Sequence, residues 1–162
     1  MIIHYMQDRD RALPLSPIPR KNWEIDAYPV NEIAEYVQDV SQGDIDVLVE
    51  EYYNKYDMIL DGRDPEEFKK RVAVQAGIEI GFERFLEEKN YQAIVTHFGD
   101  LGSLKQLPGL AIQRLMEKGY GFGGEGDWKT AAMGIEAVYI DGDTTIRNLQ
   151  NELRWNSMYF SK

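Results

Sequence analysis

The sequence predicts an α/β protein with a small, open, mainly parallel sheet flanked by helices. Three observations support this prediction. Apolar residues recur at helical spacing over most of the stretch from Val30 to Glu88. The run Ala93 to Phe98 is short, apolar and rich in β-branched residues, which is typical of a buried parallel strand. Helical and strand-like segments alternate along the chain, which favours a layered fold with about four short strands.

The composition sets the broad class of the protein. A chain of 162 residues is most simply one domain that can bury a real core. With 28 acidic against 18 basic residues the net charge is -10, which disfavours binding to nucleic acid or to an anionic membrane surface. The chain contains no cysteine, so disulfides, thiol nucleophiles and cysteine metal sites are excluded.

The first 22 residues differ from the rest. Their apolar run breaks at His4 and meets charge by Asp8, which is too short for a signal sequence or a membrane span, so we expect a cytoplasmic protein. Three of the six prolines fall between Leu13 and Pro19, which indicates an extended connector. Two interpretations stay open for this region: a mobile tail, or an ordered strand followed by a linker.

Three helices are predicted between Val30 and Asn90. The first ends at Ser41 to Gly43, and the second starts near Asp44. The third begins at Asp64-Pro-Glu-Glu67, where a capping carboxylate, a first-turn proline and an early glutamate satisfy the orphan amides of a helix start. The apolar faces expected to be buried contain Ile33, Ala34, Val37, Ile45, Val49, Tyr52, Phe68, Val72, Ala76, Phe82, Phe85 and Leu86.

The loop after the strand predicted at 93–98 is the first candidate site. Ligands of open α/β sheets gather beyond the carboxyl ends of the strands, which places His97 and Asp100 at the functional edge. His97 has two interpretations, as a metal ligand or as a structural residue held by a hydrogen bond.

The second candidate site is the stretch GFGGEGDWK, from Gly121 to Lys129. It contains a formal G-x-G-x-x-G, but a predicted helix, Leu110 to Lys118, stands where a dinucleotide-binding loop needs a strand. The carboxylates of Glu125 and Asp127 would also repel a phosphate. We therefore expect a loop between two helices, one that suits a hard cation or a polyol better than a nucleotide.

The remaining chain completes the alternation of helices and strands. Residues 128–133 begin another helix, and residues 135–140 alternate between apolar and polar like a strand. A last helix carries the apolar residues Ile146, Leu149, Leu153 and Met158.

The loop GFGGEGDWK, together with LKQLPGLAIQRLM from Leu104 to Met116, resembles the L-arabinose isomerase family. The resemblance runs from Trp23 to Met133 and looks like the central domain of that enzyme. Two short blocks resemble the extreme C-terminus of the family: Ile140 to Thr144, and Leu153 to Asn156 with Tyr159.

This resemblance divides the chain into three parts. Residues 1–22 form an N-terminal strand or linker that does not match the family, residues 23–133 form the central isomerase-like domain, and residues 134–162 form a C-terminal strand and helix. It implies a truncated relative that has also lost an internal segment after Met133.

The resemblance also implies a reaction and a set of ligands. The family interconverts L-arabinose and L-ribulose through an enediol, using a manganese ion held by two glutamates and two histidines. Carboxylates move the proton between C1 and C2, and the cation stabilises the developing negative charge. Glu125 matches the glutamate of the GEGDWK motif, so it is the expected catalytic residue and metal ligand.

The other three family ligands are not matched. The second glutamate belongs to a Phe-Glu-Asp-Leu motif, which here reads Phe98-Gly-Asp-Leu101, so Gly99 stands at its position. Neither His4 nor His97 matches the family's histidine motifs, and His97 and Asp100 are kept only as candidate metal ligands.

The function implied is that of an L-arabinose isomerase-like protein which is inactive as an isolated chain, because one ligand in four does not hold manganese. The alternative is a non-catalytic binding module that associates with itself or with an intact isomerase subunit. The expected small-molecule partner is L-arabinose or a related aldose, and neither nucleic acid nor a membrane is expected.

Overall fold

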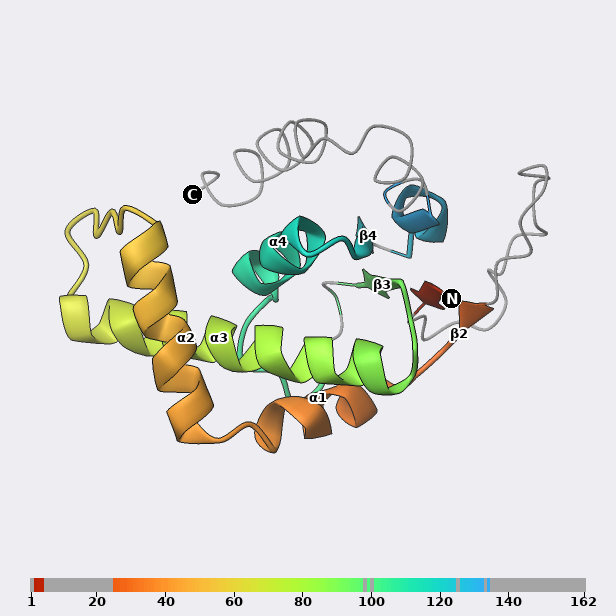
Figure 1. Ribbon diagram of the computed structural model, residues 1–162, viewed down its shortest axis with the longest axis horizontal. Coiled ribbons are helices and arrows are strands. Elements are labelled where there is room, and N and C mark those ends of the chain that lie inside the picture. The colour runs from red at the N-terminus through yellow and green to blue at the C-terminus, as the bar shows by residue number, and fades with distance from the viewer. Residues whose placement is uncertain are drawn as a thin grey trace.

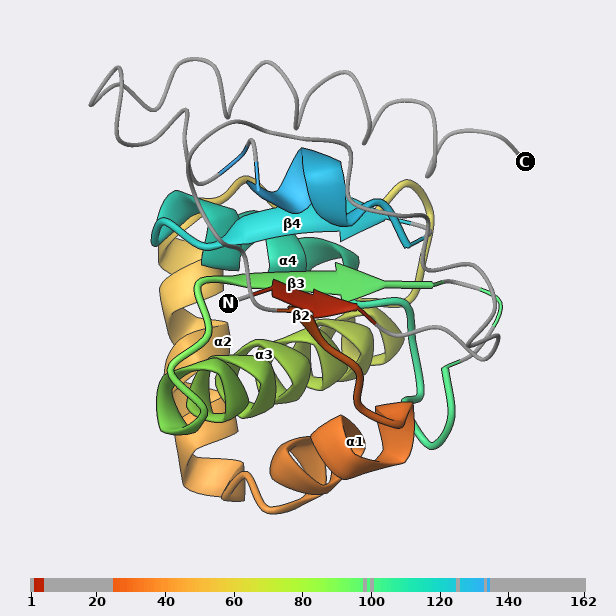
Figure 2. The same ribbon diagram turned by 90° about the vertical axis from the view of Figure 1, so that its right-hand side faces the viewer.

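Four short parallel strands form one sheet in the order β2-β1-β3-β4 (Figure 1). The strands are β1 (Ile2–His4), β2 (Ile25–Asp26), β3 (Ala93–Thr96) and β4 (Gly121–Gly124). Figure 2 shows them side by side. This computed structural model describes residues 2–4, 25–97, 99, 101–124, 126–132 and 134. Over these residues the predicted α/β class with a small, open, parallel sheet is confirmed.

The helices of the described ranges are α1 (Val30–Gln38), α2 (Gln42–Lys55), α3 (Pro65–Glu88) and α4 (Gly109–Glu117), and residues 128–132 are also helical. None of them is long and apolar enough to cross a membrane. The strand predicted at 135–140 and the last predicted helix lie outside the described residues. Of the two interpretations of the N-terminus, the ordered strand is observed for residues 2–4, which pair with both β2 and β3.

The starts of two helices are fixed by side-chain caps. The Asp64 carboxylate accepts a hydrogen bond from the Glu67 backbone N–H at 2.9 Å, as the sequence predicts for the start of α3. The Ser41 hydroxyl accepts from the Asp44 backbone N–H at 3.2 Å, so Ser41 caps the start of α2. The sequence had instead predicted that Ser41 to Gly43 end the first helix. The physical reason is that a serine oxygen satisfies the free amides of a helix start better than it ends a helix.

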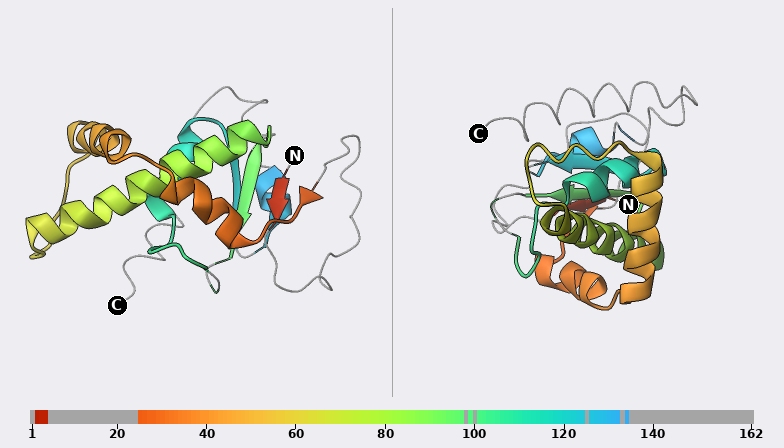
Figure 3. Two further views of the ribbon diagram at one scale, coloured as in Figure 1. Left: turned by 90° about the horizontal axis from the view of Figure 1, so that it is seen from below. Right: turned by 90° about the vertical axis from the view of Figure 1, so that its left-hand side faces the viewer.

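The long helix α3 connects two apolar clusters (Figure 3). Figure 3 shows the sheet near one end of α3 and α2 crossing near the other. At the sheet end, Phe82 and Phe85 of α3 pack with Ile94 of β3 and Leu115 of α4, all of them buried. At the other end, the buried side chains that join α2 to α3 are Val49, Tyr52, Val72 and Ala76. Because one rigid helix belongs to both clusters, α3 sets the position of α2 relative to the sheet.

The opposite face of the sheet is covered by the helical segment 128–132. Side chains alternate across a strand, so Ala93 and Val95 point away from the face used by Ile94. They pack with Ala131 and Ala132, and all four are buried. The sheet is therefore covered on both faces, which explains why β3 reads as a continuous apolar run.

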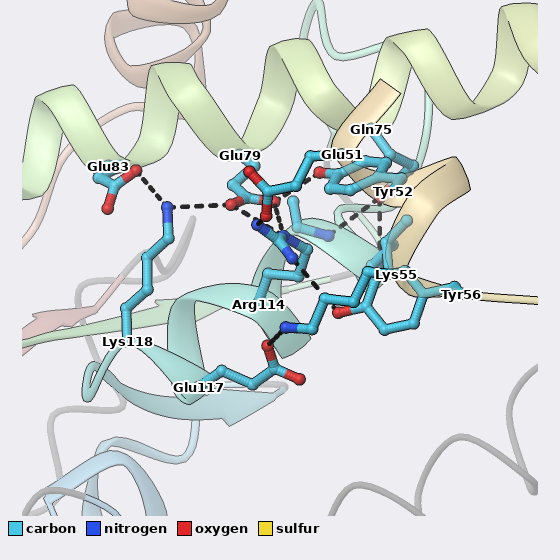
Figure 4. A network of polar contacts seen from close by, with 12 residues as sticks. Glu51, Tyr52, Lys55, Tyr56, Gln75, Glu79, Glu83, Arg114, Glu117 and Lys118 are labelled. Atoms are coloured by element: carbon cyan, nitrogen blue, oxygen red, sulfur yellow. Dashed lines mark hydrogen bonds and ion pairs between the residues drawn. The ribbon is translucent and has the colours of Figure 1, made fainter. Parts of the chain in front are cut away.

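A buried ionic network ties α4 to α3 (Figure 4). Glu79 of α3 is fully buried, and its carboxylate accepts hydrogen bonds from the Arg114 Nε atom at 2.8 and 3.1 Å. The Tyr52 hydroxyl donates to the same carboxylate, and the Lys118 ammonium lies 3.0 Å from it. Arg114 also forms an ion pair with Glu51 of α2. Burial and the hydrogen bond to Glu79 raise the pKa of the Tyr52 hydroxyl, which keeps it a donor.

A glutamine of α3 caps the start of α4. Pro108 precedes α4 and offers no side-chain cap. The Gln75 side-chain oxygen instead accepts from the backbone N–H groups of Leu110 and Ala111, at 3.1 and 3.3 Å. Its amide nitrogen donates to the Leu107 carbonyl at 2.8 Å. The orphan amides at the start of α4 are thus satisfied by another helix, which fixes where α4 begins.

We predict that Arg114→Leu lowers the free energy of unfolding by about 3 kcal/mol, because the buried Glu79 carboxylate loses its main cation. This value is at the low end for a broken buried pair, since Lys118 still contacts Glu79. Urea unfolding followed by circular dichroism measures the change. The matched control is Arg84→Leu, which breaks the exposed pair with Asp44 and should cost less than about 1 kcal/mol. Equal losses of unfolding free energy in the two variants would contradict the assignment of Arg114 as the main cation of the buried Glu79 carboxylate.

Candidate functional site

The carboxyl ends of β3 and β4 meet at one edge of the sheet. Thr96 pairs with Gly124, so the residues that follow each strand start side by side. The chain continues from Thr96 to His97 and from Gly124 to position 125. The strand order also reverses between β1 and β3, and ligands of open parallel sheets bind in the crevice at such a switch point. The edge that the sequence interpretation selected is therefore the candidate site.

Of the predicted site residues, the structure describes His97 only. Its side chain is exposed, and its Nδ1 atom accepts a hydrogen bond from the Gly99 backbone N–H at 3.0 Å. This geometry matches the interpretation of His97 as a hydrogen-bonded residue, whereas its role as a metal ligand stays a prediction. Asp100 and Glu125 lie outside the described residues.

The loop from Leu101 to Pro108 is anchored to α1 and α3. The Ser103 backbone N–H donates to the Asn31 side-chain oxygen at 3.0 Å, and the Gln38 amide donates to the Ser103 hydroxyl at 3.2 Å. The Gln106 side-chain oxygen accepts from Gln75 at 3.0 Å. Sequence reasoning missed these contacts, because single polar residues on a helix give no signal that a distant loop bonds to them. They hold the chain that leaves the candidate site in a defined path.

A small apolar pocket lies beneath this loop. Its volume is about 30 Å³, whereas clefts that enclose small ligands start at about 300 Å³. This pocket is therefore too small to enclose a pentose. The lining residues are Val30, Ile33, Phe82, Val95, Thr96, His97, Leu101, Leu104, Leu107 and Pro108.

Three of the four glycines of GFGGEGDWK, namely Gly121, Gly123 and Gly124, lie in a strand and not in the predicted loop. Gly121 to Gly124 pair with β3 from end to end. A side chain at Gly123 would overlap the Asp127 carbonyl oxygen, so the chain turns back tightly against the strand only because this residue has no Cβ. Glycine has weak strand propensity, which is why sequence patterns did not indicate β4.

The predicted order of helix, loop and helix was wrong in its middle part, because Gly121 to Gly124 form a strand. The prediction that a helix precedes these glycines is confirmed by α4, whereas a dinucleotide fingerprint needs a strand before them. The carboxylates still disfavour a phosphate. One oxygen of Asp127 accepts from the Thr130 backbone N–H at 3.0 Å and another from the Thr130 hydroxyl. An anion already sits where a phosphate would need free amides, so the geometry does not favour a nucleotide.

The described residues do not fit a manganese site. They contain no group of three or more histidine, aspartate or glutamate side chains that could hold a metal ion. Residue 99, at the carboxyl edge of β3, is a glycine and offers no carboxylate.

Comparisons with known proteins match the chain to L-arabinose isomerases. A family model described as the L-arabinose isomerase central domain matches residues 19–141. The L-arabinose isomerase of Geobacillus kaustophilus (strain HTA426) is 44% identical over 124 residues, which are 76% of this chain and 25% of that protein. The L-arabinose isomerase of Serratia proteamaculans (strain 568) is 47% identical over 121 residues, 74% of this chain and 24% of that protein. The chain spans about a quarter of the length of these curated relatives.

We predict that Gly123→Ala destabilises the fold by about 3 kcal/mol, because the new methyl group forces the 124–127 turn away from β4. The matched control is Gly124→Ala in the same strand, where an added Cβ meets no atom within 4 Å. This control should be neutral or stabilising by about 0.5–1 kcal/mol, since alanine costs less conformational entropy than glycine. Thermal melting of both variants measures the difference, and similar melting temperatures would contradict the tight turn.

Proposed function

The chain belongs to the L-arabinose isomerase family, and on this premise we propose that it has the scaffold of the family's central domain but does not isomerise L-arabinose as an isolated chain. The family match over residues 19–141 and identities of 44 to 48% support the first part. The fold agrees, because its parallel sheet brings the residues after β3 and β4 to one edge.

One observation carries the second part of the proposal: residue 99 is a glycine. By the family resemblance, this position holds one of two glutamates, and Glu125 corresponds to the other. Moving a proton between two neighbouring carbons requires acid and base groups fixed on the substrate within hydrogen-bond reach. A single carboxylate at position 125 leaves the other side of the reacting carbons without such a group.

The sheet geometry explains why the loss at position 99 matters. Thr96 and Gly124 are paired, so positions 99 and 125 lie only three residues and one residue beyond neighbouring strand ends. Two carboxylates in those places would follow neighbouring strand ends at one edge of the sheet. With only one, the edge retains a group that can bind a polyol or a cation weakly, because affinity for a transition metal depends on several ligands in fixed geometry.

We predict no formation of L-ribulose from L-arabinose by the purified chain at saturating manganese. Ketose formation is measured over time, with the full-length Geobacillus kaustophilus L-arabinose isomerase as the positive control in the same buffer. Turnover above the metal-free background, abolished by Glu125→Gln, would contradict the proposal.

A mixing experiment tests the interaction-module alternative. The chain is added to that full-length isomerase, and the mixture is analysed by sedimentation velocity. If the chain is not an interaction module, the two proteins sediment independently and the activity of the full-length enzyme is unchanged. A saturable complex would favour the alternative, in which the chain acts by associating with intact subunits.

A further inference from the structure

The connection between α2 and α3 contains a tight turn at Asp61 and Gly62. It lies at the end of the molecule away from the sheet (Figure 1). The φ angles of Asp61 and Gly62 are 48° and 76°, and the Arg63 backbone N–H donates to the Leu60 carbonyl at 2.9 Å. Positive φ at both central residues is the signature of a type I′ turn, for which Asp-Gly is one of the favoured pairs. The two residues therefore specify this turn locally.

The side chain of Asp61 and the backbone nitrogen of Gly62 are both accessible. Both residues are exposed. Within the part of the chain that the structure describes, neither the Gly62 N–H nor the Asp61 carboxylate forms a hydrogen bond or an ion pair. A Cβ atom built on Gly62 would meet no atom within 4 Å. No neighbouring group therefore keeps the Asp61 carboxyl group from the nitrogen that follows it.

We propose that Asp61–Gly62 is a self-modification site, at which the aspartate converts to isoaspartate through a cyclic imide. The Gly62 nitrogen attacks Cγ of Asp61, an N–Cγ bond forms, and the amide proton leaves with the carboxyl hydroxyl group as water. Water then adds to one of the two carbonyl carbons of this five-membered ring. Addition at the former backbone carbonyl breaks its bond to nitrogen and gives isoaspartate, whereas addition at Cγ restores aspartate. The water released in the first step is returned in the second, so the conversion needs no oxidant and no cofactor.

A nearby aspartate provides a matched comparison for this site. Asp57 is also exposed and stands four residues earlier in the same connection. The residue after it is Met58, whose side chain packs on the apolar cluster between α2 and α3. A side chain on the following residue crowds the attacking nitrogen and restricts its backbone, whereas glycine does neither. Imide formation is therefore expected at Asp61 and not at Asp57.

The conversion changes the connection between the two helices. In isoaspartate the main chain runs through Cβ and Cγ, so it is longer by one carbon atom, and the former backbone carboxyl group becomes a free side chain. The turn closed by the hydrogen bond from Arg63 to Leu60 has no room for an additional main-chain atom. Asp64, which caps α3, lies after the turn. We therefore expect isoaspartate to open the turn while the helices keep their circular dichroism.

Isotope incorporation into the full chain tests the proposal. The folded protein is incubated in H₂¹⁸O at mildly acidic pH, because the hydroxyl group leaves as water from the protonated carboxyl group, and is then digested with trypsin in ordinary water. Cleavage after Lys55 and Arg63 releases residues 56–63, which contain both Asp57 and Asp61. Fragmentation of this peptide by electron transfer locates ¹⁸O and separates isoaspartate from aspartate. The expected result is one ¹⁸O and growing isoaspartate at Asp61, with Asp57 unlabelled.

The synthetic peptide of residues 56–63 shows whether the folded chain reacts. We expect similar rates in the protein and in the peptide, because the turn is exposed. A reaction that required global unfolding would be slower in the protein by about a thousandfold or more, the ratio of folded to unfolded chains. A rate reduced in this way, no label at Asp61, or equal label at Asp57 and Asp61 would overturn the proposal.

Two variants at the same position test the ring chemistry. Asp61→Asn keeps a pair that favours the type I′ turn, and its amide should be lost as ammonia through the same imide. Asp61→Glu would need a six-membered ring and should take up no ¹⁸O at this position. An asparagine that keeps its amide in the folded chain, or a labelled glutamate, would contradict attack by the Gly62 nitrogen.

Discussion

The contact between Glu79 and Arg114 is the constraint on which the arrangement of the site depends. It lies where α3 and α4 meet. The buried Glu79 carboxylate has three partners: Tyr52 of α2, Arg114 of α4, and Lys118, which directly follows α4. The helix α4 leads directly into β4, so its position decides where β4 joins the sheet. Burying a paired charge in this way adds little net stability. A placement of α4 that left the buried Glu79 carboxylate without its cations would be costly. The network therefore favours one placement of α4 over others.

The cap provided by Gln75 also fixes the position of α4. It bonds both to the first amides of α4 and to the end of the loop that leaves β3. One residue of α3 thus positions the end of the site loop and the start of the next helix. The chemistry of the candidate edge lies on loops, and these loops are held by polar contacts to helices that are themselves fixed by apolar packing.

Much of this fold can be predicted from the sequence because its signals are local. The cap at Asp64, the apolar faces of the helices and the β-branched run at β3 each follow from neighbouring residues. The strand β4 could not be predicted, because its four residues are GFGG and its pairing depends on β3, which lies far back along the chain. The burial of Glu79 was also missed. Its position between Ile78 and Ile80 was the available signal, but the partner Arg114 is 35 residues away.

The candidate site could likewise be predicted only in part from the sequence. Strand position alone indicated the edge and His97, and the family resemblance indicated Glu125 and the glycine at position 99. The hydrogen bond from Gly99 to His97 required the structure, since so short a loop has no periodic pattern from which a ring orientation follows.

We propose that this scaffold keeps the edge where the residues after β3 and β4 meet but does not hold manganese. Electron paramagnetic resonance of Mn²⁺ tests it most directly, because the free aqueous ion gives a sharp spectrum that weakens when the ion is bound. We expect the chain to leave the free-ion signal nearly unchanged at equimolar concentrations of protein and Mn²⁺. Stoichiometric loss of the signal in the presence of this chain would contradict this proposal.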